Sequence, residues 1–278
     1  MNAIDQSYAY CTKVARSRAK NFYYSFLLLS RQQRKAMCAI YAFMRYCDDL
    51  SDEPGATRAA IEQWRAELEE ALAGRFSGHP VWPAFHHTVR RFGIPHQFFR
   101  DMIEGVAGDL EPRCFETFDQ LYRYCYQVAS VVGLTIIHIF GFDTRTALPL
   151  AEKCGVAFQL TNILRDIRED AANGRIYLPA EDLQRFGVTE AEVRAGERSQ
   201  AMLALLRFEA HRARQYYQES APLLDLVHPR SRSSLWALVA IYSRLLDRIE
   251  QKDYDVFSER VRLSAMEKSM IVVRAFVG

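Results

Sequence analysis

Two mainly apolar stretches carry polar side chains at helical spacing, and these stripes constrain the fold more than any other feature. In YAFMRYCDDLSDE (41–53), one helical face would hold a phenol, a guanidinium and two carboxylates: Tyr41, Arg45, Asp48 and Asp52. In AFQLTNILRDIRED (157–170), a second face would hold two amides and two carboxylates: Gln159, Asn162, Asp166 and Asp170. Intervals of three and four residues place side chains on one side of an α-helix. The sequence therefore predicts two helices that are apolar apart from one acidic face.

The simplest interpretation of these carboxylates is a solvated charge ladder, because acidic residues near helix ends are often exposed. Two observations argue against it. Carboxylates four residues apart repel each other, and an unpaired carboxylate on a buried helix is costly. A hard divalent cation removes both problems, since magnesium takes oxygen ligands and shares its coordination shell with substrate phosphates. We therefore predict magnesium and a diphosphate between the two helices, with Lys20, Arg45 and Arg165 as nearby cations.

Helical periodicity also dominates the rest of the chain, and no convincing run alternates by two as strands do. The expected helices run from 31 to about 52, 58 to 74, beyond 95 through 106, 118 to 140, 148 to 170, 189 to 195, 201 to 217, and 229 to 254. No Pro/Gly/Ser-rich linker and no short repeat divides the sequence. We therefore expect one all-α domain over residues 1–278.

Composition and charge remove several classes of function. The net charge of +2 is too small to indicate nucleic-acid binding by itself. Six cysteines are scattered without a CxxC pair, which favours reduced thiols in a reducing compartment. There is no HExxH, and His86 and His87 are adjacent rather than helically spaced, so a soft-metal site is disfavoured.

Membrane-spanning and secretory segments are not expected either. The start of the chain lacks an apolar signal-peptide core. The most apolar run, residues 128–142, is shorter than the ~20 residues that span a bilayer, and His138 interrupts it. We expect this run to be a buried helix that lines an apolar cavity, together with the aromatic and leucine-rich residues 22–29. The protein is expected to be cytoplasmic and either soluble or peripheral to a membrane.

A diphosphate site beside an apolar cavity in an all-α domain indicates an isoprenoid substrate. With these motifs the chain resembles the squalene/phytoene synthase family over almost its whole length, and it is similar in look to bacterial hopanoid-pathway presqualene diphosphate and squalene synthases. The matching segments are AKNFYYSFLLL, AIYAFMRYCDDLSDE, YCYQVASVVG, AFQLTNILRDIREDAANGRIYLP and IYSRLLDRI. The resemblance implies an isoprenoid-synthase helical fold with a central apolar cavity, and head-to-head condensation of two prenyl diphosphates.

The resemblance also implies roles for individual residues. The positions linked to magnesium are Asp48, Asp52, Asn162, Asp166 and Asp170. The positions expected to contact diphosphate are Lys20, Arg45, Gln159, Arg165, Tyr242 and Arg260. Tyr41 and Tyr124 would line the reaction centre, and either tyrosine or the released diphosphate would take the proton. One departure is Ala19, because many relatives have serine beside the lysine; Asn21 would supply a polar contact at its own position.

The substrate and the product stay open at this stage. Phe22 and Phe26 are one helical turn apart and would plug the cavity end, which favours farnesyl diphosphate. The product would then be presqualene diphosphate, squalene or dehydrosqualene, and NADPH is required only for squalene. No GxGxxG follows a strand, which disfavours a Rossmann NADPH site. The alternative enzyme is a phytoene synthase that uses geranylgeranyl diphosphate.

Three other interpretations are weaker. A terpene cyclase would share two acidic motifs, but NILRDIRED followed by GRIYLP has the condensing-enzyme form. A non-catalytic lipid-binding or assembly factor would not need both pairs of aspartates. Any membrane contact would be peripheral, through the cavity mouth or the arginine-rich stretches 90–100 and 228–236, although solvated surface explains those stretches more simply. The sequence does not define the oligomeric state.

Overall fold

The computed structural model describes residues 2–19, 22–52, 56–76, 78–110 and 114–277, without the side chains of Phe22, Asp52 and Val277. Within these ranges the secondary structure is helical, with no strand and a single isolated bridge between Phe142 and Val227. The elements, in chain order, are α1 (Ala3–Arg18), α2 (Phe22–Phe26), α3 (Arg31–Asp52), α4 (Arg58–Leu72), α5 (Trp82–Phe92), α6 (Gln97–Gly108), α7 (Phe118–Cys125), the π-helix η1 (Tyr126–Ser130), α8 (Val131–Phe140), α9 (Ala147–Ala172), α10 (Ala180–Phe186), α11 (Glu190–Ala195), α12 (Gln200–Ser220), α13 (Leu223–Leu226), α14 (Pro229–Gln251) and α15 (Ala265–Val277). The all-α prediction is confirmed.

Local capping explains where several helices begin. The Thr57 hydroxyl accepts a hydrogen bond from the Ala60 amide at 3.2 Å and so caps the start of α4. Thr189 and Glu192 form a reciprocal capping box at the start of α11. The last predicted helix was too long: α14 ends at Gln251, because Asp253 and Tyr254 adopt left-handed φ angles of 48° and 57°. Helices α1, α2, α5, α10, α13 and α15 were not predicted.

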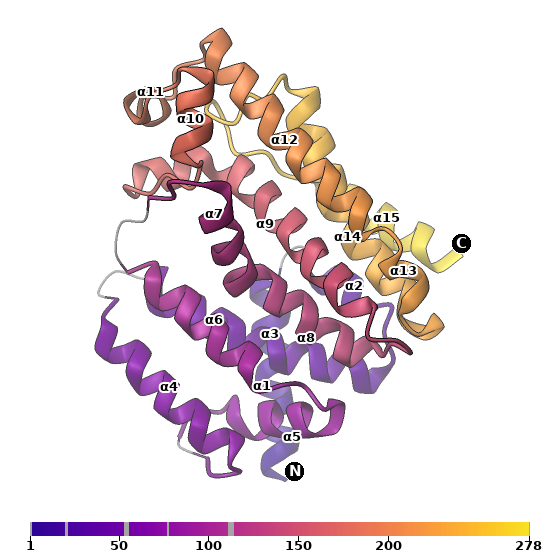
Figure 1. The fold of residues 1–278 in the computed structure, drawn as a ribbon. Helices are drawn as coiled ribbons and strands as arrows, with labels where there is room; N and C mark the ends of the chain where they lie inside the picture. The colour runs from indigo at the N-terminus through magenta and orange to yellow at the C-terminus, as the bar shows by residue number, and fades with distance from the viewer. Residues whose placement is uncertain (1, 20–21, 53–55, 77, 111–113, 278) are drawn as a thin grey trace.

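The long helices pack around a common centre. Figure 1 shows the continuous run of α7, η1 and α8 beside α9, with α3 behind them and α12 and α14 on the other side. On the outer side of α3, Phe43 packs between the rings of Trp64 and Phe85, whose centroids lie 5.8 and 4.6 Å away. One connected set of buried apolar side chains extends from Tyr8 to Leu263. This packing fixes α3 from outside, so its inner face is free to line a cavity.

Helix α9 and the π-helix approach each other closely at a glycine. A β-carbon on Gly155 would lie only 2.5 Å from the Cα atom of Ser130. Because real β-carbons essentially never come so near a backbone atom, the two helices can meet at this distance only with glycine here. None of the described helices is both long enough and apolar enough to cross a bilayer.

Candidate functional site

A cavity of about 350 Å³ lies between α3, α6, α8, α9 and α14, within the ~300–1,000 Å³ range of ligand sites. Its lining is polarised along two helices. On α3 the lining residues run from Met37 to Asp48 and Ser51, and on α9 they run from Ala151 to Asp170. In both helices the first half contributes apolar side chains and the second half contributes carboxylates. The cavity is therefore apolar along its body and acidic at one end.

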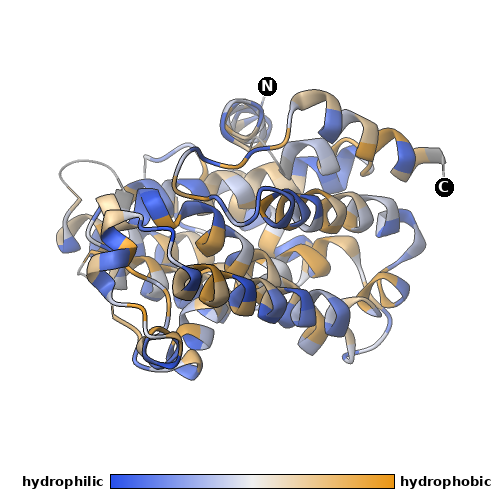
Figure 2. Cartoon of the chain, turned by 90° about the horizontal axis from the view of Figure 1, so that it is seen from above, coloured by the Kyte–Doolittle hydropathy of each residue, from blue (hydrophilic) through white to orange (hydrophobic). Residues whose placement is uncertain are grey.

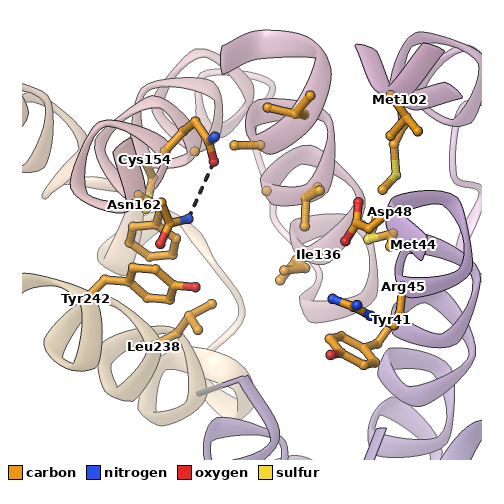
Figure 3. Close-up of a pocket in the computed structure, with 18 of the residues that line it drawn as sticks. Tyr41, Met44, Arg45, Asp48, Met102, Ile136, Cys154, Asn162, Leu238 and Tyr242 are labelled. Carbon is orange, nitrogen blue, oxygen red and sulfur yellow. Dashed lines mark hydrogen bonds between the residues drawn. The ribbon is translucent and has the colours of Figure 1, made fainter. Parts of the chain in front are cut away.

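The acidic end brings together the two predicted stripes. Asp48 from α3 and Asn162, Asp166 and Asp170 from α9 all line the cavity. Figure 3 shows Arg45 and Asp48 on the α3 side, facing Asn162 and Tyr242 across the space. Side chains that are more than a hundred residues apart in sequence thus share one site, as the spacing of the stripes predicted.

Two features of this end fit a cation site. The Oδ1 atom of Asn162 is buried and has no hydrogen-bond partner among the described residues, while its Nδ2 atom donates to Gln159 Oε1 at 3.4 Å (Figure 3). Burial, and then the negative charge of Asp166, raises the pKa of Asp170 to about 7. A buried oxygen acceptor and a carboxylate that is hard to ionise are both stabilised by a positive charge.

The donor set fits magnesium that is shared with a substrate, and it does not fit a site closed by protein ligands alone. Among the described side chains, no three His, Cys, Asp or Glu residues converge as a complete metal site. Magnesium commonly keeps several waters and uses one or two carboxylates plus substrate phosphates. Asp48, Asp166 and Asp170, with the Asn162 amide oxygen, offer that kind of open arrangement. The side chain of Asp52, the fifth predicted ligand, lies outside the described residues.

Three arginines are tied to the acidic end in different ways. Arg45 lines the cavity and forms an ion pair with Asp49, one turn further along α3. Arg165 Nε donates to Asp166 Oδ1 at 2.7 Å, and Arg260 Nε lies 2.9 Å from the same oxygen. Arg165 and Arg260 do not line the cavity, so they stand behind Asp166 rather than at the cavity wall.

The two predicted reaction-centre tyrosines both line the cavity. Tyr124 donates a hydrogen bond to Asp109 Oδ2 at 3.1 Å and stacks on Tyr177, with ring centroids 5.2 Å apart. Burial raises the pKa of Tyr124 well above its usual value, and it raises the pKa of Tyr41 to about 12. Both phenols are therefore neutral near pH 7, which makes either one a poor base.

Other predicted residues divide into those placed and those not described. Gln159, Tyr242 and Phe26 line the cavity, and the Tyr242 ring stacks on Phe158 at 4.3 Å. Lys20 and Asn21 lie outside the described residues, as does the side chain of Phe22.

Sequence reasoning missed Asp109, Arg175 and Tyr177, which line the acidic end next to Tyr124. Arg175 Nη2 donates to the backbone oxygen of Asp109 at 2.9 Å, so it fixes the C-terminus of α6. Arg175 and Tyr177 belong to GRIYLP, a segment that signalled the family without indicating side-chain roles. Met102 and Val106, which share the cavity-facing side of α6 with Asp109, are apolar, and only the fold brings Asp109 to Tyr124.

The π-helix keeps the side chains of one cavity wall on the same face of the α7–η1–α8 run. Tyr124, Val128, Val132 and Ile136 all line the cavity, at intervals of four residues. On a regular α-helix such an interval drifts by about 40° per step, so four residues would leave one face. The wider turn at Tyr126–Ser130 absorbs the drift. Gly105 of α6 lies against this turn, since a β-carbon there would be 2.9 Å from Gln127 Cβ and Val128 Cγ1.

An all-helical fold around a cavity with paired aspartates at one end defines an isoprenoid synthase. The chain belongs to the squalene/phytoene synthase family, whose model matches residues 15–267. The family and fold that the sequence motifs suggested are thereby confirmed.

Relatives with assigned names include phytoene synthases. The chain is 36% identical over 277 residues to phytoene synthase 1 of Arabidopsis thaliana, a match that covers 96% of this chain and 65% of the plant protein. It is 38% identical over 283 residues to the phytoene synthase of Arthrospira platensis, covering 95% of this chain and 90% of the relative. The chain thus spans less than two thirds of the length of the plant protein.

Solved structures add relatives with other products. A dehydrosqualene synthase in complex with a ligand superposes with a TM-score of 0.92 at 31% identity, over 98% of this chain and 96% of that one. The squalene synthase HpnC of Alicyclobacillus acidocaldarius superposes with a TM-score of 0.84 at 30% identity, over 91% and 99% of the two chains.

Proposed function

We propose that this protein condenses two molecules of farnesyl diphosphate head to head, with presqualene diphosphate as the first product. The observation that carries the proposal is the polarised cavity, because it offers cation-binding oxygens at one end and an apolar body behind them. A diphosphate fits the acidic end only together with a cation, and an isoprenoid tail fits the apolar body. Neither a cyclic polar substrate nor a nucleotide matches this division.

The length of the apolar body supports a fifteen-carbon substrate. From Asp48 back to Met37, the lining of α3 spans about 16 Å at 1.5 Å per residue. An extended chain advances roughly 1.2 Å per bond, so the twelve main-chain carbons of a farnesyl group need about 14 Å, and the sixteen of a geranylgeranyl group need about 19 Å. Ser234 Oγ donates to Ser25 O at 2.9 Å, which places the neighbouring Phe26 beside the first turns of α14 at the apolar end. The longer chain would have to bend or displace Phe26.

Chemistry at the acidic end follows from its charges. Magnesium, when bound by Asp48, Asn162, Asp166 and Asp170, would stabilise the negative charge of the departing diphosphate. Arg45 supplies a positive charge in the cavity wall, and the ring faces of Tyr41 and Phe158 suit an allylic cation. The apolar walls exclude water, which would otherwise capture that cation.

The second substrate then acts as the nucleophile. Its double bond attacks the allylic cation, a carbon–carbon bond forms, and loss of a proton closes the cyclopropane ring. Because Tyr41 and Tyr124 stay protonated, we assign proton acceptance to the released diphosphate. Tyr124 and Asp109 then orient the substrates. Ionisation of the second diphosphate in the same cavity would lead on to squalene with NADPH, or to dehydrosqualene by proton loss.

A phytoene synthase is the second candidate, and the similarity to named phytoene synthases at 36–38% identity favours it. The test is a product analysis. Purified protein is incubated with farnesyl or geranylgeranyl diphosphate, with magnesium or with a chelator, and with or without NADPH. A thirty-carbon lipid formed only with magnesium supports the proposal, and its identity shows where the reaction stops. Phytoene formed in preference from geranylgeranyl diphosphate overturns it.

A further inference from the structure

Helix α15 has an unusual outer face. Four of its side chains are large, apolar and exposed: Met266 at 70%, Met270 at 53%, Val273 at 61% and Phe276 at 81%. Elsewhere in the described chain only three large apolar side chains are exposed, and they are scattered. Spacings of four, three and three residues place the four on one side of the helix. Figure 2 shows this helix at the edge of the molecule, where it leads to the C-terminus.

The opposite side of α15 is fixed to the body of the protein. Ser264 and Glu267 cap its first turn, with the Ser264 amide donating to Glu267 Oε2 at 2.9 Å. Arg248 of α14 pairs with the same glutamate. The inner face contains Ala275, which is 7% exposed, and the helix packs on α14 and α2. The outward apolar face thus belongs to a helix whose orientation is fixed by its contacts. Exposing this face to water is unfavourable in free energy, and no other part of the described fold covers it.

Arg274 is the charged residue that borders this face most closely, and Glu267 lies next to it on the helix. At 100° per residue, the sector from Phe276 to Arg274 contains the positions of the four exposed apolar residues, Ser269 and Val277, and no acidic residue. Glu267, the one acidic residue of α15, is turned to Arg248. Lys268 lies at the α2 side, with its Nζ atom 6.0 Å from the Tyr24 ring.

We propose that α15 is an in-plane anchor that seats the protein on an anionic lipid surface. Met266, Met270, Val273 and Phe276 would enter the boundary between headgroups and acyl chains, while Arg274, at the edge of the same face, meets lipid phosphates. Thirteen residues are too few to span a bilayer but enough to lie along its surface. The proposal concerns this surface alone and stands whichever prenyl diphosphate is the substrate.

A second copy of the chain fits this surface less well. A helix face about 20 Å long and ~10 Å wide offers roughly 200 Å², against the ~800 Å² that each partner contributes to a stable interface. The arginine-rich stretches 90–100 and 228–236, which the sequence suggested for membrane contact, contribute no exposed large apolar side chain, although both are fully described. Phe99 and Leu235, for example, are buried. The membrane-facing surface is thus assigned to α15.

The test is sedimentation with vesicles of phosphatidylcholine containing about 30% phosphatidylserine, compared with pure phosphatidylcholine. We expect binding to the anionic vesicles that weakens at high salt. The double variant Met270→Glu/Val273→Glu should bind at least ~10-fold more weakly, because charges replace the inserted side chains. The matched control is Phe76→Glu, since Phe76 is 47% exposed but lies far from α15 in sequence and should leave binding unchanged.

Two further measurements keep the result interpretable. Circular dichroism and diphosphate release from dilute substrate should be unchanged in the double variant, since neither residue lines the cavity. Sedimentation velocity without lipid distinguishes a membrane surface from a dimer interface. Three outcomes would overturn the proposal. The wild type and the double variant could bind vesicles equally, the wild type could fail to bind, or the protein could form a dimer that depends on α15. Loss of activity on farnesyl diphosphate alone would count against the proposed reaction and leave the anchor intact.

Discussion

Arg260, in the segment after α14, reaches back to α9, where its Nε atom lies 2.9 Å from Oδ1 of Asp166. Its Nη1 atom lies 3.0 Å from Glu169, and Arg165 contacts the same aspartate from within α9. Two guanidinium groups therefore hold Asp166 in place from behind, while the residue lines the cavity in front. A carboxylate fixed in this way is pre-organised to receive a cation and a diphosphate.

Asp166→Ala and Asp48→Ala should each reduce turnover by at least ~100-fold, because each removes a carboxylate from the proposed cation site. Diphosphate release in the presence of magnesium measures the effect, and circular dichroism checks that the helices persist. Asp143→Ala is the matched control, since that side chain is 85% exposed and remote from the cavity. Near-normal activity in either variant would refute the assignment of these aspartates.

Tyr124→Phe should lower kcat/KM by about 10-fold, because it removes the hydrogen bond to Asp109. The shape of the pH–rate profile should not change, since a phenol whose pKa is raised well above its usual value does not ionise in the working range. Measuring kcat/KM across pH for both proteins tests the point. Disappearance of a titrating limb in the variant would instead identify Tyr124 as the base.

Phe26→Leu should shift the substrate preference toward geranylgeranyl diphosphate by about 10-fold, because it lengthens the apolar end of the cavity. Competition between the two substrates, read by mass spectrometry of the products, measures this ratio. Phe99→Leu is the control: Phe99 is also fully buried but does not line the cavity, so it tests for general loosening of the core. An equal shift in both variants would contradict a role for Phe26 in chain length.

Glu209 should make the free energy of unfolding depend on pH. Burial, and the negative charge of Asp182, raise the pKa of Glu209 from 4.5 to about 8, although the positive charge of Arg212 opposes the shift. Both carboxylates contact one guanidinium, Arg212, at 2.8 Å. The folded state therefore holds a proton that the unfolded state releases, and stability falls as pH rises from about 4.5 to 8, by at most ~1.4 kcal/mol per pH unit.

The variant Glu209→Gln keeps a hydrogen-bonding group but removes the titration. Its stability curve should be flatter than that of the wild type over the same pH range, as measured by chemical denaturation at several pH values. Glu104→Gln, at a side chain that is 62% exposed, should retain the wild-type slope. Parallel curves for the wild type and Glu209→Gln would show that Glu209 is already ionised in the folded protein.

Gly155→Ala should destabilise the protein by about 1–3 kcal/mol or more, because its β-carbon would lie 2.5 Å from a backbone atom of Ser130. Thermal or denaturant unfolding measures the loss. Gly78→Ala is the control, because no atom lies within 4 Å of a β-carbon at that position. A neutral Gly155→Ala variant would mean that α9 and η1 can separate without cost.

Periodicity and capping signals predicted the elements that carry the site. The stripes on α3 and α9 have a strong spacing signal, and Thr57 and Thr189 mark helix starts by their own hydrogen bonds. These are local properties, so one sequence suffices. Asp109 and Arg175 were missed because their roles arise only where two distant segments meet at Tyr124. Helix α15 was missed because Ile271, Val272 and Ala275 lie on the side opposite to its exposed apolar residues, so the sequence shows no single apolar stripe there.

Because of the π-helix at Tyr126–Ser130, the number of residues in this segment determines which side chains face the cavity. Removing Tyr126 or Gln127, which do not line the cavity, would restore a regular helix and rotate everything before it by about 100°. Tyr124 would then turn away from Asp109, although every side chain of the site would still be present in the sequence. The spacing between Tyr124 and Ile136 is therefore under the same constraint as the identity of either residue. A gap of one position in this stretch should be as damaging as the loss of a catalytic group.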